Sequence, residues 1–293
     1  MKDQKMLAGS GEIAEDNGTL GLTVYGNVGA DMQTVLSYTG TGQVQSSVAW
    51  LTGGFTGTEG PQGPEPAGIE IAQLWDDNGA LGLIIYGSPG GNPQAVFAQP
   101  DMGQSSGAVA FLAGNFTGSA TTEIAQLWDN NGALGLIVYG MSGGTLQTLV
   151  TYPDMGQGSS ALAFLVGDFT GSGATEIAQL WDNNGILGLI VYSVANGILA
   201  TPVAQPDMGQ GSGALAFLTG YFTGAGTTTQ IAQTRDNNGS LQLLIYGDIG
   251  NGSLSTLFSN FVGQQPYALA WVTGDFTGTG DTQILQAWMA VRS

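Results

Sequence analysis

The stretch that decides the fold is Glu123 to Gly140, which reads EIAQLWDNNGALGLIVYG, and from Glu176 to Ser193 the chain reads EIAQLWDNNGILGLIVYS. The same phrase returns from Ile69 as IEIAQLWDDNGALGLIIYG and from Gln230 as QIAQTRDNNGSLQLLIYG. The aspartates that anchor it are spaced 53, 53 and 54 residues apart, at Asp76, Asp129, Asp182 and Asp236. Self-similarity at a nearly constant period indicates a repeat architecture.

A fifth copy of the phrase is split between the two ends of the chain. TQILQAWMAV begins at Thr282, and EDNGTLGLTVYG begins at Glu15. Five units of about 53 residues then account for nearly all of the 293 residues. Repeats of about 40–50 residues with four strands each are typical of β-propeller blades.

Each unit is predicted to contain four short strands separated by turns. In the clearest copy the expected strands are 161–169, 176–181, 187–192 and about 199–205. Asn183, Asn184 and Gly185 predict a type I′ hairpin turn, because Asn and Gly accept the positive φ values that this turn needs. Runs such as LGLIVY are apolar on both faces of a strand, so each small sheet is expected to be packed on both sides.

The sequence therefore predicts an all-β fold, a five-bladed β-propeller that forms a single domain over residues 1–293. Strands from the two ends of the chain are expected to share one composite blade, which would close the ring and leave no exposed strand edges. An open β-solenoid or a two-sheet sandwich is the alternative. The expected blades are about 46–100, about 107–153, about 160–206, about 213–260, and the composite of 267–293 with 12–39.

The composition excludes several classes of function. The chain has 22 Asp or Glu, 4 Lys or Arg, no His and no Cys, and its formal net charge is −18. Without His and Cys it has no imidazole base, no thiolate nucleophile and no zinc–thiolate site. A chain so poor in cations does not neutralise phosphates, so neither nucleic acid nor an anionic membrane is an expected partner. The acidic residues recur with the repeat instead of forming one asymmetric pair, and we therefore expect no enzymatic activity.

The 50 glycines follow no Gly-X-Y period, which favours a turn-rich β fold over collagen. No apolar stretch approaches 18 residues, so no membrane span is predicted. The first residues, MKDQKMLAGSGEIAEDNG, lack the apolar core of a secretory signal, which leaves cytoplasmic location and non-classical export both open. Residues 9–14 look like a shortened second strand, and residues 1–11 are expected to be disordered or outside the ring. The sequence assigns no role to the Pro-rich insertion at 59–68.

Val166 to Leu180, VGDFTGSGATEIAQL, resembles the FG-GAP or VCBS repeat, whose core reads roughly G-D-F-N-G-D-G-x-x-D before an apolar strand. The resemblance covers about 15 residues in each unit. It implies a propeller in which this loop joins the two innermost strands, and the family includes integrin heads and several bacterial and fungal lectins. The loop of many members binds Ca²⁺, and the residues that the resemblance implies for this role are Asp168, Thr170, Ser172, Ala174 through its carbonyl, and Glu176.

Calcium is nevertheless disfavoured, because its affinity follows the number of charged ligands and this loop has two carboxylates. The favoured interpretation is that Thr and Ser hydroxyls hold the turn by bonding to backbone groups. We therefore expect no metal and no other cofactor.

The tryptophans of the repeat and the polar residues after them are the first candidate for ligand binding. A Trp face packs against the C–H groups of a sugar, while Asp and Asn bond to its hydroxyls. Packing of Trp between blades and an ordinary hairpin turn are the structural alternatives. The candidate residues are Trp75, Asp76, Trp128, Asp129, Asn130, Trp181, Asp182 and Asn183, with Trp288 as the fourth tryptophan of the series.

A second candidate is the recurring segment Pro-Asp-Met-Gly-Gln, in the loop between the last strand of one blade and the first strand of the next. Its Asp would accept sugar hydroxyls, its Gln offers both a donor and an acceptor, and its Met packs on an apolar patch. A simple Pro-initiated turn is the alternative. The candidate residues are Asp101, Gln104, Asp154, Gln157, Asp207 and Gln210.

Together these patterns predict a multivalent carbohydrate-binding protein, a lectin, that recognises neutral glycans at repeated sites. Repetition suits this function, because weak binding at single sites gains avidity on a surface with many copies of the ligand. The alternative is a non-catalytic scaffold that binds a protein partner within a larger assembly. Competition by a soluble monosaccharide distinguishes the two.

Overall fold

The computed structural model describes most of the chain, and all its named elements are strands. No helix in this described part is long and apolar enough to cross a membrane. The described residues are 4–7, 11–16, 19–28, 31–39, 47–57, 70–87, 94–156, 158, 160–224, 227–249, 254–264, 267–277 and 279–289.

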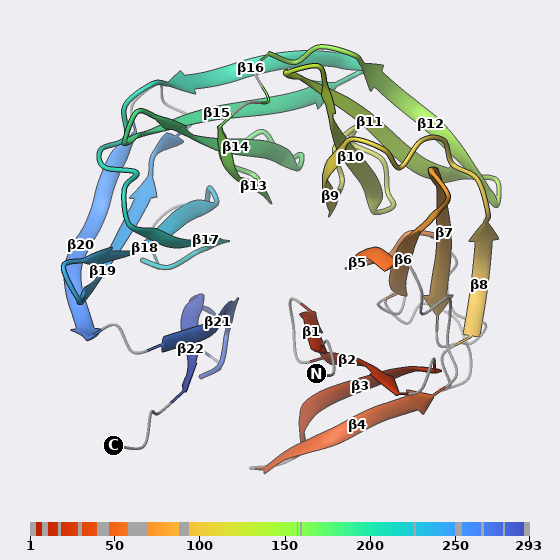
Figure 1. The fold of residues 1–293 in the computed structure, drawn as a ribbon, viewed down its shortest axis with the longest axis horizontal. Helices are drawn as coiled ribbons and strands as arrows, with labels where there is room; N and C mark the ends of the chain where they lie inside the picture. Colours follow the sequence, from red (N-terminus) through yellow and green to blue (C-terminus); the bar gives the residue numbers. More distant parts are fainter. Residues whose placement is uncertain are drawn as a thin grey trace. The chain divides into compact units, whose positions relative to one another are not determined.

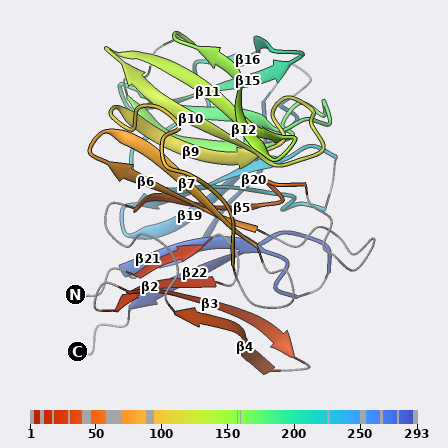
Figure 2. The ribbon, with the colours of Figure 1, turned by 90° about the vertical axis from the view of Figure 1, so that its right-hand side faces the viewer.

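Within these residues, five antiparallel sheets have four strands each, and every sheet is built from consecutive strands in chain order (Figure 1). Figure 2 shows one of them, β9 to β12, with its strands side by side. The first sheet consists of β1 (Gln4–Leu7), β2 (Gly11–Asp16), β3 (Thr19–Val28) and β4 (Asp31–Thr39), and the second of β5 (Ser47–Gly53), β6 (Glu70–Asp77), β7 (Ala80–Gly87) and β8 (Gln94–Gln99). The third consists of β9 (Ala108–Gly114), β10 (Glu123–Asn130), β11 (Ala133–Ser142) and β12 (Thr145–Tyr152), and the fourth of β13 (Ala161–Gly167), β14 (Glu176–Asn183), β15 (Ile186–Ala195) and β16 (Ile198–Gln205). The fifth consists of β17 (Ala214–Gly220), β18 (Gln230–Asn237), β19 (Ser240–Gly247) and β20 (Ser255–Gln264). The prediction of an all-β fold with four-stranded, blade-like sheets is confirmed.

The expected composite blade is not formed, so the strand pairing does not support a closed five-bladed ring. The last two strands, β21 (Tyr267–Gly274) and β22 (Gln283–Met289), pair with each other as a separate sheet, while β3 and β4 share a sheet with β1 and β2. In the β2–β3 hairpin Glu15 pairs with Leu20, just as Asp182 pairs with Leu187 in β14 and β15. Pairing neighbouring strands closes a short loop, which costs less conformational entropy than joining the two ends of the chain.

The N-terminal residues also correct the prediction. Residues 4–7 form β1, and residues 11–16 form β2, so this segment belongs to a sheet instead of lying outside the blades. The shortened second strand expected at 9–14 corresponds to β2. The insertion at 59–68 lies outside the described residues.

The described chain divides into two compact units. One comprises residues 1–115 and 119–156, and the other comprises residues 116–118 and 157–293. Sheets β5–β8 and β9–β12 lie in the first unit, and sheets β13–β16 and β17–β20 lie in the second. The assignment of residues 1–293 to a single domain stays a prediction.

The hairpins between the second and third strands of these four sheets have the predicted type I′ geometry. Their central Asn residues have φ of 53° or 54°, and the following glycines have φ between 86° and 97°. Two consecutive positive φ values define this turn, and its twist matches that of the two strands. The hairpins are centred on Asn78 and Gly79, Asn131 and Gly132, Asn184 and Gly185, and Asn238 and Gly239.

The second and third strands of each of these sheets carry the core. In β10, Ile124 to Leu127 are all buried, and in β11 Leu134 and Leu136 have no exposed surface. Fourth strands such as β12 and β16 are mostly exposed. The expectation of packing on both faces is therefore met by the middle strands.

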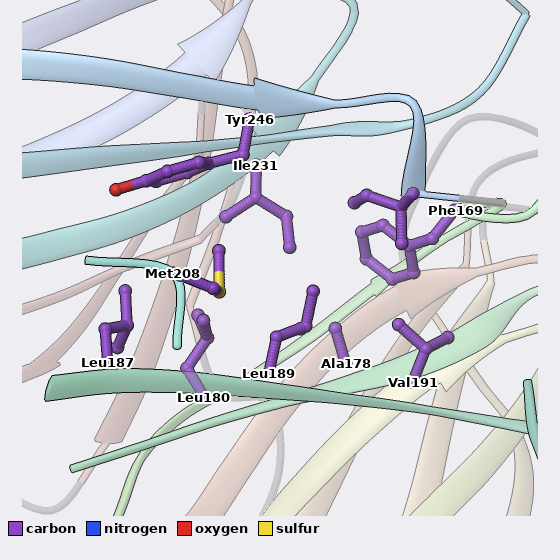
Figure 3. Packing of buried hydrophobic residues seen from close by; sticks show 10 residues of the cluster. Phe169, Ala178, Leu180, Leu187, Leu189, Val191, Met208, Ile231 and Tyr246 are labelled. Carbon is purple, nitrogen blue, oxygen red and sulfur yellow. The ribbon is translucent and has the colours of Figure 1, made fainter. Parts of the chain in front are cut away.

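An apolar cluster fills the space between two sheets in each unit. In the second unit, side chains from β14 and β15 meet Ile231 of β18 and Tyr246 of β19. Met208, from the recurring Pro-Asp-Met-Gly-Gln loop, is 8% exposed and lies between Ile231 and Leu180 (Figure 3). The thioether is a flexible apolar filler. Met208 therefore packs within the apolar cluster of its own unit.

Candidate functional site: tryptophans, hairpins and loops

Three tryptophans lie over glycines of the neighbouring strand. The pairs are Trp75 with Gly82, Trp128 with Gly135, and Trp181 with Gly188. A Cβ atom on any of these glycines would lie 2.2 or 2.3 Å from atoms of the indole ring. Each ring therefore occupies space that only glycine leaves free. All three tryptophans are partly exposed, unlike the fully buried leucines that precede them.

The fourth complete repeat has a different pair at this position. Arg235 of β18 stands where the other repeats have Trp, and it pairs with Gln242 instead of glycine. For Trp288, the last tryptophan of the series, the structure describes the backbone, which pairs with Ala268.

The hairpin aspartates hold the turns. Oδ1 of Asp129 accepts the backbone N–H of Gly132 at 2.6 Å, and Oδ1 of Asp182 accepts that of Gly185 at 2.6 Å. Asp129 and Asp182 remain exposed, so both carboxylates are reachable from solvent. Each has a turn-stabilising role, whatever else it binds.

Asp76 bonds to two partners among the described residues. Its Oδ1 accepts the N–H of Gly79 at 2.8 Å and also the hydroxyl of Ser105. The hydroxyl of Ser105 and, to a lesser degree, the N–H of Gly79 lower the pKa of Asp76, because both bonds favour the charged form.

The two hairpin asparagines named as candidates differ in their contacts. Asn130 donates from Nδ2 to the carbonyl of Pro153 at 3.1 Å, so it connects the hairpin to the Pro-Asp-Met-Gly-Gln loop of its own sheet. Asn183 is exposed at the end of β14, where it pairs with Ile186.

The loops that carry Asp101, Asp154 and Asp207 share one conformation. Oδ1 of each aspartate accepts the N–H of the glycine two residues later at 2.8 Å. The Met N–H and the Gly carbonyl of each loop bond to a leucine at the start of the third strand, at 2.7 and 2.8 Å. All three aspartates are exposed, and so are Gln104 and Gln210. Gln157 lies outside the described residues.

Two of these loops can be followed to the next sheet within the same unit. Gln126 of β10 donates from Nε2 to the carbonyl of Gln104 at 2.9 Å, and Gln233 of β18 donates to the carbonyl of Gln210 at 3.2 Å. Gln210 also accepts, on Oε1, a hydrogen bond of 2.7 Å from Nη2 of Arg235. The loop glutamine thus lies beside the strand that carries Trp or Arg. The loop aspartates, in contrast, bond within their own loops.

A buried Tyr–Gln pair lies behind each site and was missed by sequence reasoning. The hydroxyls of Tyr86, Tyr139, Tyr192 and Tyr246 donate to Oε1 of Gln73, Gln126, Gln179 and Gln233, at 2.9 to 3.1 Å. Burial raises the pKa of Tyr139, Tyr192 and Tyr246 to about 12, and for Tyr246 the positive charge of Arg235 acts against this rise. The recurring AQ and Y of the repeat were the available signal.

Exposed aliphatic side chains at bulges were also missed. Val48, Val109, Leu162 and Leu215 are 38–50% exposed, and each is the second residue of the first strand of its sheet. The strand pairing skips each of them, as expected of a β-bulge. Their neighbours Ser47, Ala108, Ala161 and Ala214 pair with the Trp or Arg position. An apolar side chain therefore stands near each candidate site.

The loop that resembles the FG-GAP or VCBS calcium loop is organised by the protein's own hydrogen bonds. Glu176 is 1% exposed, and its two carboxylate oxygens accept the N–H of Thr170, at 2.8 Å, and the Thr170 hydroxyl. Asp168 accepts the N–H of Gly173 at 3.0 Å and the hydroxyl of Ser172 at 3.5 Å. The described residues contain no group of three or more acidic side chains placed to hold a metal ion.

Neither a family model nor a curated protein matches the sequence. The resemblance to FG-GAP and VCBS repeats therefore stays a prediction. Among solved structures, the exotype rhamnogalacturonan lyase YesX is 14% identical with a TM-score of 0.43, over 76% of this chain and 54% of that one. Rhamnogalacturonan lyase YesW is 13% identical with a TM-score of 0.41, over 94% and 65% of the two chains. The rhamnogalacturonan lyase PL11 of Bacillus licheniformis is 14% identical with a TM-score of 0.41, over 97% and 59%.

This chain spans 54–65% of the length of those three proteins. All three are named as enzymes, and this finding contradicts the prediction that the chain has no enzymatic activity. With TM-scores of 0.41–0.43 the likeness carries no further argument about what this chain acts on.

Proposed function

We propose that this protein is a multivalent carbohydrate-binding protein whose ligands at the tryptophan sites are neutral glycans. Each site would use a partly exposed Trp and the hairpin Asp after it, and at Trp128 also Gln104 and Asp101 of the Pro-Asp-Met-Gly-Gln loop that is bonded to the same strand. The observation that carries the proposal is the repeated placement of an indole over a glycine, at Trp75, Trp128 and Trp181.

The partial exposure of the tryptophans supports binding over simple packing. A Trp used for packing alone gains most when it is fully buried, as Leu127 is at 0% exposure. Trp128 instead keeps part of its surface in solvent while Gly135 backs it from one side. A ring fixed in this way loses little further entropy when the C–H face of a sugar packs on it.

The polar groups near the tryptophans suit sugar hydroxyls. The exposed carboxylate of Asp129 accepts hydrogen bonds, and the amide of Gln104 both accepts and donates them. The backbone carbonyl of Gln104 is held by Gln126 at 2.9 Å, which fixes the end of the loop beside the Trp strand. Preorganised groups of this kind lower the entropic cost of binding.

The charge of the chain favours neutral ligands at these sites. With a net charge of −18, the protein repels polyanions at long range. Neutral sugars bind without this penalty. Several weak sites on one chain also gain avidity against a surface that displays many copies of the sugar.

A glycan array probed with the labelled protein, with and without EDTA, tests the proposal. Neutral glycans should bind, the free monosaccharide should compete, and EDTA should change nothing, because Glu176 is already bonded to Thr170. Rhamnogalacturonan, the polymer in the names of the similar solved structures, is included on the same array with a parallel assay for its cleavage. An array without neutral-glycan binding would overturn the proposal.

Calorimetry with variants assigns the sites. Replacing Trp75, Trp128 and Trp181 by Phe should reduce the number of sugar molecules bound, because the smaller ring offers less surface over the glycine. Trp50→Phe is the matched control, because Trp50 lies in β5 and pairs with Gln73 away from the glycine positions. Equal loss in the control would show that the tryptophans serve packing alone.

The second candidate is a protein-interaction scaffold. It is favoured by the exposed aliphatic residues at the bulges, Val48, Val109, Leu162 and Leu215, since exposed apolar surface often marks a protein interface. On this alternative a free monosaccharide does not compete with the bound partner.

A further inference from the structure

The sheet β17–β20 keeps the frame of the other repeats but changes the residues that face the candidate site. Gln233 and Tyr246 make the same buried hydrogen bond, at 2.9 Å, that Gln179 and Tyr192 make in β13–β16. Its hairpin is also of the same type. The positions of Trp and its glycine are instead occupied by Arg235 and Gln242.

The two exchanges depend on each other. In the other three sheets the indole ring lies where a Cβ atom would be, within 2.2 or 2.3 Å. A side chain at position 242 fills that space, so an indole in the same place would clash with it. Gln242 itself donates from Nε2 to Ser259 of β20 at 3.2 Å. Because both partners differ together, the site is built for a different side chain and is not a damaged copy of the tryptophan site.

The guanidinium of Arg235 is held in place by a hydrogen bond, and no carboxylate of the described residues neutralises its charge. Nη2 donates to the neutral amide oxygen of Gln210 at 2.7 Å. Among the described residues no carboxylate forms an ion pair with it, and its buried Nε has no acceptor. The adjacent Asp236 bonds through Oδ1 to the N–H of Gly239, at 2.6 Å. Four of the five guanidinium donors therefore have no acceptor in this part of the chain.

A planar group with several unused donors fits a carboxylate better than any other sugar substituent. Arg and carboxylate form two parallel charge-assisted hydrogen bonds, which a hydroxyl cannot match. Arg235 is partly exposed, so a ligand can reach its end. The repulsion from the chain's other charges is screened beyond about 8 Å at physiological ionic strength, whereas the direct pair is within bonding distance.

We propose that Arg235, held by Gln210, forms a subsite for the carboxylate of an acidic sugar, a uronic acid, in contrast to the neutral-sugar sites of the tryptophans. This inference rests on the proposed function, because it assigns a ligand class to one of the same repeated sites. It makes the repeats unequal: three tryptophan sites take neutral rings, and one arginine site selects for a charged ring. Gln210 is a positioning residue in this scheme.

Titration calorimetry on the full chain tests this with galacturonate, glucuronate, galactose, glucose and acetate. A uronate should bind the unchanged protein, more weakly as salt is raised. Arg235→Gln should weaken uronate binding about tenfold or more, because a charged hydrogen-bonded pair is lost, and should leave binding of the neutral sugars unchanged. Arg235→Lys should give an intermediate loss of uronate affinity, since the charge stays but the planar group that forms two parallel hydrogen bonds is removed.

The double variant Arg235→Trp/Gln242→Gly is the matched control, because it rebuilds the pair found in the other sheets. It should lose uronate binding and bind one more neutral sugar per chain. Melting temperatures of all variants check that they fold. Uronate binding that is absent, unchanged in Arg235→Gln, or equalled by acetate overturns this inference. If the unchanged protein binds the uronate but no neutral sugar, the proposed function is overturned instead. Failure of this inference and failure of the proposed function are therefore distinguishable.

Discussion

The space that Gly188 leaves for Trp181 can be tested by filling it with one methyl group. In Gly188→Ala the new Cβ would lie 2.3 Å from Cε2 and Cζ2 of the ring. Carbon atoms pack best at about 3.5–4.0 Å, so the ring would have to move by more than an ångström. The backbone has little freedom to yield, because β15 is paired with β14 on one side and β16 on the other.

We expect Gly188→Ala to lower the free energy of unfolding by about 1–3 kcal/mol, the usual cost of inserting a methyl group into packed surroundings. For a chain of this length that corresponds to a fall in melting temperature of about 2–6 °C, at about 2 °C per kcal/mol. The displaced ring should also lose its sugar, so the number of neutral sugars bound per chain should fall by one.

Circular dichroism melts of the single and double variants provide the assay. If the cost comes from the clash, Gly188→Ala should cost much less in a chain that already carries Trp181→Ala, with a coupling of about 1–3 kcal/mol. Gln242→Ala, at the equivalent position in β19, should have a small effect, because no ring lies over it. An equal cost of Gly188→Ala with and without the Trp181 ring would refute the reasoning.

Three further changes test the hydrogen bonds around the sites. Tyr192→Phe removes the hydroxyl that donates to the buried Oε1 of Gln179 and should lower the urea midpoint by the equivalent of about 1–3 kcal/mol. In the unchanged protein, burial favours the neutral form of Tyr192 and raises its pKa to about 12, which spectrophotometric titration should show. The contribution of this shift to stability is fully present below pH 10 and is lost as the pH rises through about 12. Ser105→Ala should raise the pKa of Asp76 towards its ordinary value in an NMR titration. In the unchanged protein, the stability that comes from the lowered pKa is present above the ordinary pKa of Asp and is lost as the pH falls through the pKa of Asp76 in the folded state. Asp182→Ala removes the acceptor of a hairpin N–H at 2.6 Å and should lower the melting temperature, and sugar binding by the same variant decides whether the carboxylate also contacts ligand.

Local features of the fold could be predicted from the sequence because their causes are local. The Asn-Gly pair at Asn184 and Gly185 requires two positive φ values, and the structure has them at 53° and 87°. The apolar runs of β14 and β15 fix two buried middle strands in the same way. These features depend on neighbouring residues, which the sequence displays directly.

Pairing between distant segments could not be predicted in this way. The sequence of β22 matches the second strand of a repeat, and that of β3 matches the third, so a composite sheet satisfies the same pattern as the one observed. Which of the two sheets forms depends on whether β2 is stable enough as a second strand to pair with β3, as it does with Glu15 opposite Leu20. At six residues, β2 is shorter than the other copies, and three of its six residues are acidic. The stability of such a strand is set by its neighbours in the sheet.

The sequence predicted the residue types at the candidate site, but it did not show which of them are bonded within the turns. Asp, Asn and Gln suit sugar hydroxyls and tight turns equally well, because both use the same acceptor oxygens. The structure gives Asp129 and Asp207 a definite turn bond, at 2.6 and 2.8 Å, through one carboxylate oxygen. The bulges that expose Val109 and Leu162 depend on a skipped pair in the ladder, which no alternation in the sequence marks clearly.

The variation among the repeats separates the residues that hold the sheets from those that are free to recognise ligands. The Tyr–Gln pair and the hairpin are present in all four described complete repeats, including the one with Arg235 in place of Trp. Its oxygen and hydroxyl are buried, so changing either one costs stability in any repeat. Position 235 is partly exposed, and its exchange to Arg, with Gln242 across from it, leaves Tyr246 bonded at 2.9 Å. Ligand specificity can therefore differ from one sheet to the next, because the Trp or Arg position lies outside the buried pair on which each sheet depends.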